Sequence, residues 1–397
     1  MNDDTRFALP VLADAPTTEV PPAKNIDLMS YRPCDQQCRQ CSYVEPDSDP
    51  NHPRGSAEEI AFIRRVRSNY PESSFFLYPR DIVTATPLLP VMREVNQRET
   101  LTNGNRLDAA LVRQMKDSGL NLVQITLFGT AEEQEFYNRN TPEEYARIKD
   151  HIRLCIEGGL RVQVNNILAR DTIGSMEAVC DECVRLGVPR VRFLRLTPHG
   201  DGTQLPAHLF LTQGDLEDVI IPTFERLKLK YGPRLYLSFG VNFGPNFHGK
   251  SLTEARDKIV RRNAGFPTPE LFCPAVDGEY WNISTQSGNV HWCFNNVSHT
   301  DLRIGKADWD TGRVTIDRPV DLSRETLRRR LTGICAADQC AYQEVCFGGC
   351  RTTAIAFSSE PSAEDRLYSG MDMCLTPAYA RYAAKLAQTT SEPAGGE

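Results

Sequence analysis

Three cysteines stand close together near the start of the sequence, in YRPCDQQCRQCSYVEP at residues 31 to 46. They are Cys34, Cys38 and Cys41, and the next cysteine along the chain is Cys155. Thiolates are ligands for zinc and for iron–sulfur clusters, and a closed site of either kind uses four protein ligands. Three thiolates leave one position open. The spacing therefore predicts a metal centre that can bind a further small ligand.

The other cysteines fall into two further sets. The chain has 13 cysteines, an odd number that excludes complete pairing, and disulfides are rare in a reducing compartment. Cys155, Cys180 and Cys183 lie in stretches with helical periodicity, where a free cysteine is typical of a packed core. Seven more follow between residues 273 and 374, and we interpret these, like the first three, as metal ligands.

Composition and charge exclude several classes of protein. The net charge is -7, and lysines and arginines are scattered rather than gathered in a stripe, so a nucleic acid is not expected as a partner. The N-terminus lacks a basic region and an apolar run of signal-peptide type, and no stretch resembles a membrane span. We therefore expect a cytoplasmic protein with no membrane partner.

Short apolar runs alternate with amphipathic segments over the first two thirds of the chain, which predicts repeated βα units around a parallel sheet. Six units are too few to close an eight-stranded barrel, so the expected fold is α/β, a partial (β/α)6 TIM-like barrel. Ligands of such sheets bind beyond the carboxyl ends of the strands, and the three-cysteine loop directly follows the first strand. The expected strands cover residues 25–31, 74–78, 99–103, 121–129, 161–168 and 190–196.

The alternation of apolar and amphipathic segments ends before the segment CPAVDGEYWNISTQSGNVHWCF. This segment predicts a β-hairpin with its turn at Ser287 and Gly288. The cysteine-rich region around it is too loop-rich to be stable through apolar burial alone, so metal ligation is expected to hold it together. The predicted organisation is a flexible arm at 1–24, the barrel at 25–240, a linker with a helix at 241–269, the cysteine-rich domain at 270–377, and a C-terminal helix with a disordered tail at 378–397.

The spacing CX3CX2C is similar to the motif of the radical S-adenosylmethionine (SAM) enzymes, and TLTNGNRL and VQITLFGT resemble segments of their third and fourth strands. The resemblance implies a [4Fe–4S] cluster on Cys34, Cys38 and Cys41 whose free iron binds the amino and carboxylate groups of SAM. An electron from a flavodoxin or ferredoxin-type donor then cleaves SAM, and the resulting 5'-deoxyadenosyl radical abstracts hydrogen from the substrate.

The same resemblance implies SAM contacts at Asn103, at Thr126, and at Arg195 for the carboxylate of SAM. The sequence departs from the family at two places. The Gly-Gly-Glu-Pro segment after the second strand is replaced by LYPRDIVT, where Asp81 could take the place of the glutamate. The aromatic residue expected between the second and third cysteines is missing, and Tyr43 is the nearest substitute. The sequence assigns no catalytic acid or base, and TPHGDGTQLPAHLF, which contains His199, is interpreted as a solvated loop.

The seven later cysteines are similar to the SPASM extension of radical SAM enzymes, with the usual CX2C opening widened to CX4C. The resemblance implies two auxiliary clusters, expected to be [4Fe–4S]. It leaves the first of them one ligand short, and Asp277, His291, water or substrate could supply it. The implied ligands are Cys273, Cys293 and Cys350 for auxiliary cluster I, and Cys335, Cys340, Cys346 and Cys374 for auxiliary cluster II.

Auxiliary clusters can accept the second electron when a substrate radical is oxidised. The expected function is therefore an oxidative modification or cross-link of a peptide or peptide-derived natural product. The first alternative keeps this chemistry and changes the substrate to a sugar or an amino-acid-like metabolite. The second alternative is a non-catalytic zinc or iron–sulfur scaffold, in which His52 could be a further zinc ligand to the first set.

Overall fold

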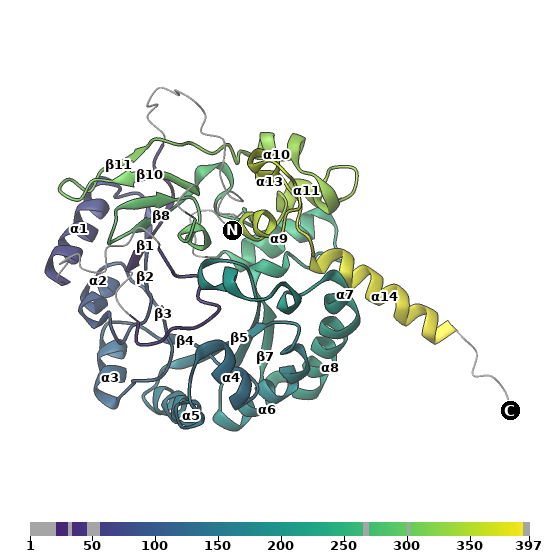
Figure 1. Ribbon diagram of the computed structural model, residues 1–397, viewed down its shortest axis with the longest axis horizontal. Coiled ribbons are helices and arrows are strands. Elements are labelled where there is room, and N and C mark those ends of the chain that lie inside the picture. Colours follow the sequence, from purple (N-terminus) through teal and green to yellow (C-terminus); the bar gives the residue numbers. More distant parts are fainter. Residues whose placement is uncertain (1–20, 31–33, 46–55, 265–269, 300–301, 392–397) are drawn as a thin grey trace.

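The computed structural model describes residues 21–30, 34–45, 56–264, 270–299 and 302–391. Most of the predicted N-terminal arm, the end of the predicted tail and His52 lie outside these ranges. In Figure 1 the strands of the barrel form the lower and left part of the molecule, and the cysteine-rich region lies above them.

The sequence prediction of a partial parallel barrel is confirmed. All six expected strands form, and a seventh, which the sequence pattern did not reveal, pairs in parallel with the sixth. Two sheets share the barrel, with the order β11-β10-β9-β8-β1-β2 in one and β3-β4-β5-β6-β7 in the other. The barrel strands are β1 (Asn25–Ser30), β2 (Ser74–Pro79), β3 (Glu99–Thr102), β4 (Leu122–Thr126), β5 (Arg161–Leu168), β6 (Arg190–Arg195) and β7 (Tyr236–Phe239).

The side chain of Gln97 joins the two sheets where β2 and β3 lie side by side. Its Oε1 accepts from the backbone N–H of Leu77 at 2.8 Å, and its Nε2 donates to the carbonyls of Leu77 and Glu99 at 2.9 and 2.8 Å. Gln97 is buried, so these three bonds satisfy backbone groups that water cannot reach. The side chain of Gln97 thus makes hydrogen bonds to both strands, in place of backbone hydrogen bonds between them.

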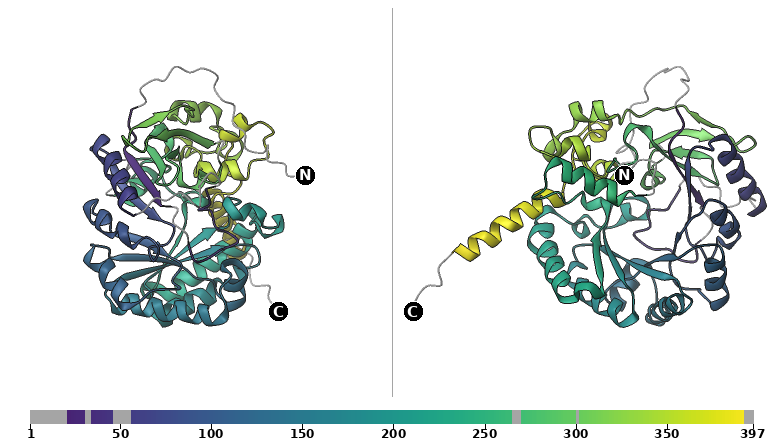
Figure 2. Two further views of the ribbon diagram at one scale, coloured as in Figure 1. Left: turned by 60° about the vertical axis from the view of Figure 1, so that its left-hand side comes forward. Right: turned by 180° about the vertical axis from the view of Figure 1, so that it is seen from behind.

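Helices cover the outer face of the sheets (Figures 1 and 2). Because side chains alternate along a strand, Ile26 and Leu28 of β1 pack in the core with residues of α1, while Asp27 and Met29 face the barrel interior. Cys155, Cys180 and Cys183 are fully buried in the same core, which confirms their structural interpretation. The helices are α1 (Ser56–Asn69), α2 (Leu89–Glu94), α3 (Ala109–Asp117), α4 (Ala131–Asn138), α5 (Pro142–Glu157), α6 (Met176–Leu186), α7 (Gln213–Asp215), α8 (Ile221–Tyr231) and α9 (Leu252–Arg262).

The predicted hairpin is formed by β8 (Tyr280–Ser284) and β9 (Asn289–His291), which pair antiparallel across a turn at Gly288 with φ of 77°. β8 also pairs in parallel with β1, so the cysteine-rich region continues the sheet of the barrel. The remaining elements are β10 (Arg303–Ala307), β11 (Val314–Ile316), α10 (Arg324–Arg330), α11 (Gln343–Cys346), α12 (Arg351–Ala356), α13 (Ala363–Leu367) and α14 (Leu375–Ser391), which projects from the body in Figure 1. Among the described residues, no helix has the length and apolar character that a membrane crossing requires.

Candidate active site and metal centres

The three-cysteine loop lies at the carboxyl ends of the first strands. Two side chains that follow neighbouring strands point nitrogen atoms at its sulfurs. Asn103, after β3, donates from Nδ2 to Sγ of Cys34 at 3.5 Å, and Arg80, after β2, donates from Nη2 to Sγ of Cys41 at 3.6 Å. Burial raises the pKa of the Cys38 thiol, and the nearby thiols of Cys41 and Cys34 raise it further, so the three thiols are neighbours. Arg80 was not singled out from the sequence.

The loop after β6 fixes the position of Cys41. The backbone N–H of Asp201 donates to the carbonyl of Cys41 at 2.9 Å. Its neighbour Gly200 has φ of +55°, and a Cβ atom there would lie 2.3 Å from the same carbonyl oxygen. Only glycine permits this approach. The cysteine loop is therefore held by a segment that lies more than a hundred residues away in the sequence.

The hairpin turn anchors the chain that leaves the cysteine loop. Glu45 is buried, and its carboxylate accepts from Oγ of Ser284 at 2.7 Å, from Oγ of Ser287, and from Nδ2 of Asn289 at 3.2 Å. Three hydrogen bonds to one carboxylate compensate for its burial. The turn that the sequence predicted from Ser287 and Gly288 thus also positions the three cysteines.

Asp81 lies beside Cys34, within reach of the end of β3. Its Oδ1 accepts from Val83 N at 2.8 Å and from Oγ1 of Thr102 at 3.0 Å, and its Oδ2 accepts from Asn103 N at 3.0 Å. Burial raises the pKa of Asp81 to about 6, and these hydrogen bonds oppose that rise. Ligand atoms of Cys34, Asp35 and Asp81 all lie within 4.8 Å of one another.

Tyr43 and Thr126 both lie on the interior side of the barrel. Tyr43 stacks on Phe294, with ring centroids 6.2 Å apart, and Phe294 also stacks on Tyr78 at 5.6 Å. Thr126 ends β4 and is half-buried on the same side as Gln124. An aromatic wall and a polar strand end therefore stand next to the cysteine loop.

The structure gives Arg195 a different partner from the one that the sequence implied. Arg195 shares the outer side of β6 with Val191 and Phe193, away from the barrel interior. Its Nη1 donates to Oδ1 of Asp372 at 2.7 Å, and its guanidinium lies 3.8 Å from the ring centroid of Phe357. These contacts hold the guanidinium of Arg195 between Asp372 and Phe357, and its implied contact with the carboxylate of SAM stays a prediction.

Asp27 is a buried carboxyl that sequence reasoning missed. It faces the barrel interior from the middle of β1 and accepts a hydrogen bond from the hydroxyl of Tyr280. Burial raises its pKa from 3.8 to about 7, against the smaller opposing effect of Tyr280. The signal was an aspartate inside the apolar strand NIDLMS. Such a perturbed carboxyl inside a barrel is a candidate acid or base.

His199 contradicts the interpretation of its segment as a solvated loop. It is 2% exposed, and its Nδ1 lies 3.1 Å from Nε2 of His299, a residue that follows the hairpin. Burial lowers the pKa of both rings, to about 3 for His199 and about 4 for His299. A pair of neutral rings therefore packs between the barrel and the cysteine-rich region.

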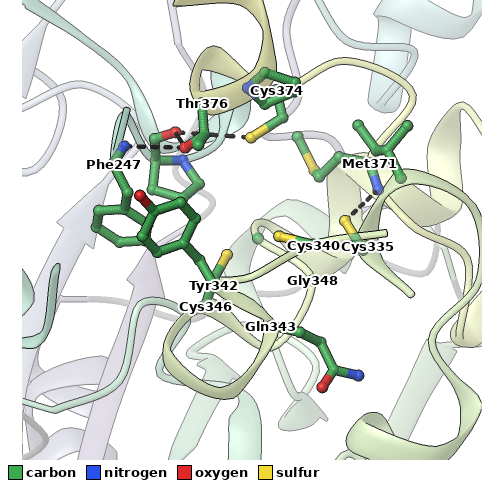
Figure 3. Close-up of a pocket in the computed structure, with 14 residues that line it drawn as sticks. Phe247, Cys335, Cys340, Tyr342, Gln343, Cys346, Gly348, Met371, Cys374 and Thr376 are labelled. Atoms are coloured by element: carbon green, nitrogen blue, oxygen red, sulfur yellow. Dashed lines mark hydrogen bonds between the residues drawn. The ribbon is translucent and has the colours of Figure 1, made fainter. Parts of the chain in front are cut away.

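Four of the later cysteines line one pocket (Figure 3). They are Cys335, Cys340, Cys346 and Cys374, the set that the sequence resemblance grouped as auxiliary cluster II. The backbone N–H of Met371 donates to Sγ of Cys335 at 3.3 Å. The structure thus brings together side chains from the loop before α11, from α11 and from the start of α14.

The other three cysteines also meet. Burial raises the pKa of the Cys293 thiol, and the nearby thiols of Cys350 and Cys273 raise it further. Oγ1 of Thr353 donates to Sγ of Cys350 at 3.3 Å. Asp277, one of the residues that could fill the open position, instead accepts from the backbone N–H of Arg324 at 2.8 Å and from its guanidinium. His291, the other, is buried, which lowers its pKa to about 3.

Both the sequence and the fold of the chain resemble those of known proteins. No family model matches the chain. A curated relative named AdoMet-dependent heme synthase, from Oleidesulfovibrio alaskensis, is 24% identical over 67% of this chain and 65% of its own length. A protein of the same name from Nitratidesulfovibrio vulgaris is 22% identical over 69% of this chain and 72% of its own. The chain thus spans about two thirds of the length of the first relative.

Two groups of solved structures share the fold. Streptococcus suis SuiB, bound to precursor peptide SuiA, superposes with a TM-score of 0.61 over 86% of this chain and 74% of SuiB, at 14% identity. Native anSMEcpe with bound AdoMet gives a TM-score of 0.58 over 93% of this chain and 100% of anSMEcpe, also at 14% identity. The chain therefore shares its fold with SuiB and anSMEcpe, and its CX3CX2C motif with seven later cysteines is the pattern that resembles the radical SAM enzymes with a SPASM extension.

The donor sets of this chain fit the clusters that the resemblance implies. Each of three sites gathers soft thiols, and each has hydrogen-bond donors directed at sulfur, from Asn103 and Arg80, from Met371, and from Thr353. Gly244 leaves room for Cys374, since a Cβ atom there would lie 2.9 Å from its sulfur. Such outer donors set the potential of a cluster.

Proposed function

We propose that the chain is a radical SAM enzyme that oxidises a carbon centre of a peptide or a peptide-derived substrate. When a reduced cluster and SAM are bound, they supply a 5'-deoxyadenosyl radical that abstracts hydrogen. The observation that carries the proposal is the placement of Cys34, Cys38 and Cys41 at the mouth of a barrel that has two further cysteine sets behind it. The naming of peptide ligands in structures that share the fold, SuiA with SuiB and Cp18Cys with anSMEcpe, favours a peptide.

The residues around the cysteine loop have separate tasks in this proposal. Asn103 and Asp81 meet at the ends of β3 and β2 beside Cys34, where their polar atoms would orient the amino acid part of SAM. Thr126 offers a hydroxyl to the ribose, and the ring of Tyr43, fixed by Phe294, offers an apolar face to adenine. Arg80 supplies a positive charge next to Cys41, where the family has glycine.

Asp27 is the proton acceptor that we propose for the oxidation. Loss of two electrons from a carbon–hydrogen or heteroatom centre also requires the loss of a proton. Asp27 faces the barrel interior, and its pKa of about 7 lets it exist as a base near neutral pH. Tyr280 donates to its carboxylate and so keeps one oxygen free to accept the proton.

The two rear cysteine sets would hold the auxiliary clusters that receive the second electron, with Cys273, Cys293 and Cys350 nearer to the barrel. Burial raises the pKa of Tyr43 and of Tyr280, and the nearby thiol of Cys293 adds to the rise, so this set lies on the barrel side and would be placed to take an electron from the substrate. A flavodoxin or ferredoxin-type protein in the cytoplasm is the proposed source of the electron that starts the cycle.

The test is transfer of deuterium from substrate to 5'-deoxyadenosine. Short peptides encoded beside the gene would be synthesised with deuterated side chains and incubated anaerobically with the reconstituted enzyme, SAM and a reductant. The proposal predicts deuterated 5'-deoxyadenosine and a peptide lighter by two hydrogens. The Cys38→Ala variant should give neither product, and the Cys180→Ala variant should give both. SAM cleavage without deuterium transfer from any peptide would contradict the peptide assignment.

A second candidate substrate is a tetrapyrrole, because both curated relatives are named AdoMet-dependent heme synthase. Propionate-bearing porphyrins, with and without iron, form the second arm of the same assay. Binding that changes the Soret absorption, together with porphyrin-dependent formation of 5'-deoxyadenosine, would favour this candidate over a peptide.

A further inference from the structure

Arg351 is an arginine without solvent exposure in the cysteine-rich region. It is the first residue of α12 and directly follows Cys350, a proposed ligand of auxiliary cluster I. A buried guanidinium stays charged, because its pKa is too high for it to release a proton. The fold must therefore compensate for a full positive charge at this point.

The hydrogen bonds of Arg351 account for only part of its guanidinium. Nη2 donates to the carbonyls of Gly348 at 2.9 Å and Ser369 at 2.7 Å. Nε and Nη1 have no partner among the residues that the structure describes, although both are buried. A buried charge with unpaired donors costs several kcal/mol, so two carbonyls are an insufficient reason for an arginine here.

Thiols from both rear sets stabilise the positive charge of Arg351. Burial lowers the pKa of Arg351, and the charges that oppose this come from Cys335, Cys273, Cys346 and Cys350, in decreasing order. Two of these belong to each proposed auxiliary cluster. Gly348, whose carbonyl accepts from Nη2 of Arg351, also lines the pocket of the second set, and Cys350 of the first set directly precedes Arg351 in the chain. The guanidinium therefore lies between the two sets.

Gly348, three residues before Arg351, leaves the space that the guanidinium occupies. Gly348 has φ of +81°, and a Cβ atom there would lie 3.0 Å from both Cζ and Nη2 of Arg351 and 2.6 Å from Leu331. An alanine would displace the guanidinium from its two carbonyl partners. The local sequence FGGCR thus combines a ligand, a cation and the space that the cation needs.

We propose that Arg351 is a positioning residue shared by the two auxiliary clusters, with Nε and Nη1 donating to sulfur atoms on both sides. This rests on the proposed function, since it requires both cysteine sets to hold clusters. A reduced cluster carries one more negative charge than the oxidised form, so a fixed cation and N–H donors stabilise it. Arg351 therefore raises the reduction potentials of both clusters and makes each a better electron acceptor.

The experiment measures potentials rather than turnover. In the full chain with Cys34, Cys38 and Cys41 changed to alanine, only auxiliary clusters remain, and their reduction is followed by EPR during an anaerobic redox titration. Arg351→Gln and Arg351→Lys are compared with Arg329→Gln, which removes an arginine that is 69% exposed in the same region. Iron and sulfide are counted for every variant.

Arg351→Gln should lower the equilibrium constant for one-electron reduction about tenfold at both clusters, which equals about 59 mV. Arg351→Lys keeps the positive charge but loses the planar set of N–H donors. The equilibrium constant for reduction should therefore change about threefold for at least one cluster. Arg329→Gln should change it for neither cluster. Unchanged potentials in Arg351→Gln, or a shift at one cluster only, would overturn the proposal. If Arg351→Gln does not load iron, unchanged potentials in Arg351→Lys would overturn it.

A parent chain with iron for fewer than two clusters would also overturn the shared role. That result leaves SAM cleavage by the native enzyme to be measured separately, so failure of this inference and failure of the proposed function are distinguishable.

Discussion

Replacing Asp27 by asparagine should stabilise the protein, and more so at higher pH. Asparagine keeps an acceptor for the hydroxyl of Tyr280 but cannot ionise. The carboxyl of Asp27 has a pKa of about 7 in the fold against 3.8 for the unperturbed group. The folded state therefore binds this proton more tightly than the unfolded chain, and the contribution of Asp27 to stability falls as the pH rises from about 4 to about 7 and is then constant.

The magnitude follows from these two pKa values. The raised pKa lowers the free energy of unfolding by about 1.7 kcal/mol at pH 5, where Asp27 is ionised only in the unfolded chain. At pH 8, where Asp27 is ionised in both the folded and the unfolded state, it lowers it by about 4.3 kcal/mol. The free energy of unfolding of Asp27→Asn relative to the native protein should therefore rise by about 2.5 kcal/mol between pH 5 and pH 8. For a chain of 397 residues this equals about 3 °C in Tm.

The assay compares anaerobic melting curves of both proteins at equal iron content, at pH 5, 6, 7 and 8. The control is Asp150→Asn, which removes a carboxylate that is 69% exposed and should show no widening gap. In the same variants, Asp27→Asn should cleave SAM but form little oxidised product, and the pH dependence of product formation near 7 should disappear. A Tm gap that is constant with pH would refute the buried, protonated state of Asp27.

Two further changes test how the metal sites are built. Gly200→Ala should lose about one third of the iron with the auxiliary clusters retained, because its Cβ would clash with the carbonyl of Cys41, and iron analysis checks this. Gly187→Ala, which also has a positive φ but meets nothing within 4 Å, should keep all the iron, and equal losses in both variants would contradict the reasoning. Cys374→Ala should lose only the second auxiliary cluster, seen as one missing EPR component, while the core variant Cys180→Ala should keep every component. Retention of all components by Cys374→Ala would contradict the assignment of that pocket.

The strands and the hairpin could be predicted from sequence because each has a local cause. The buried strands of the barrel are short apolar runs between amphipathic segments, and Gly288 supplies the positive φ of the hairpin turn. β7 was missed because YLSF is only four residues long. The join between β2 and β3 through Gln97 could not be predicted, since it depends on one side chain bonding to two strands.

The cysteine sets were also accessible from the sequence, because ligand spacing is encoded in the order of residues. The surrounding residues were not, because they depend on contacts between distant segments. Arg195 is an example: alternation along β6 places it on the outer face, and its partner Asp372 comes from far along the chain. Asp27 and Arg351 had local signals, a carboxyl inside an apolar strand and an arginine among cysteines. Their importance became clear only from the structure, which shows that both side chains are buried.

The most direct test of the account is electron–nuclear double resonance on the reduced, oxygen-protected enzyme with SAM labelled at its amino nitrogen and carboxylate oxygen. If Cys34, Cys38 and Cys41 hold a cluster with one open iron, the cluster signal should couple to both labels, and this coupling should vanish in Cys38→Ala. A fully loaded enzyme whose cluster signals show no coupling to either label would contradict the account.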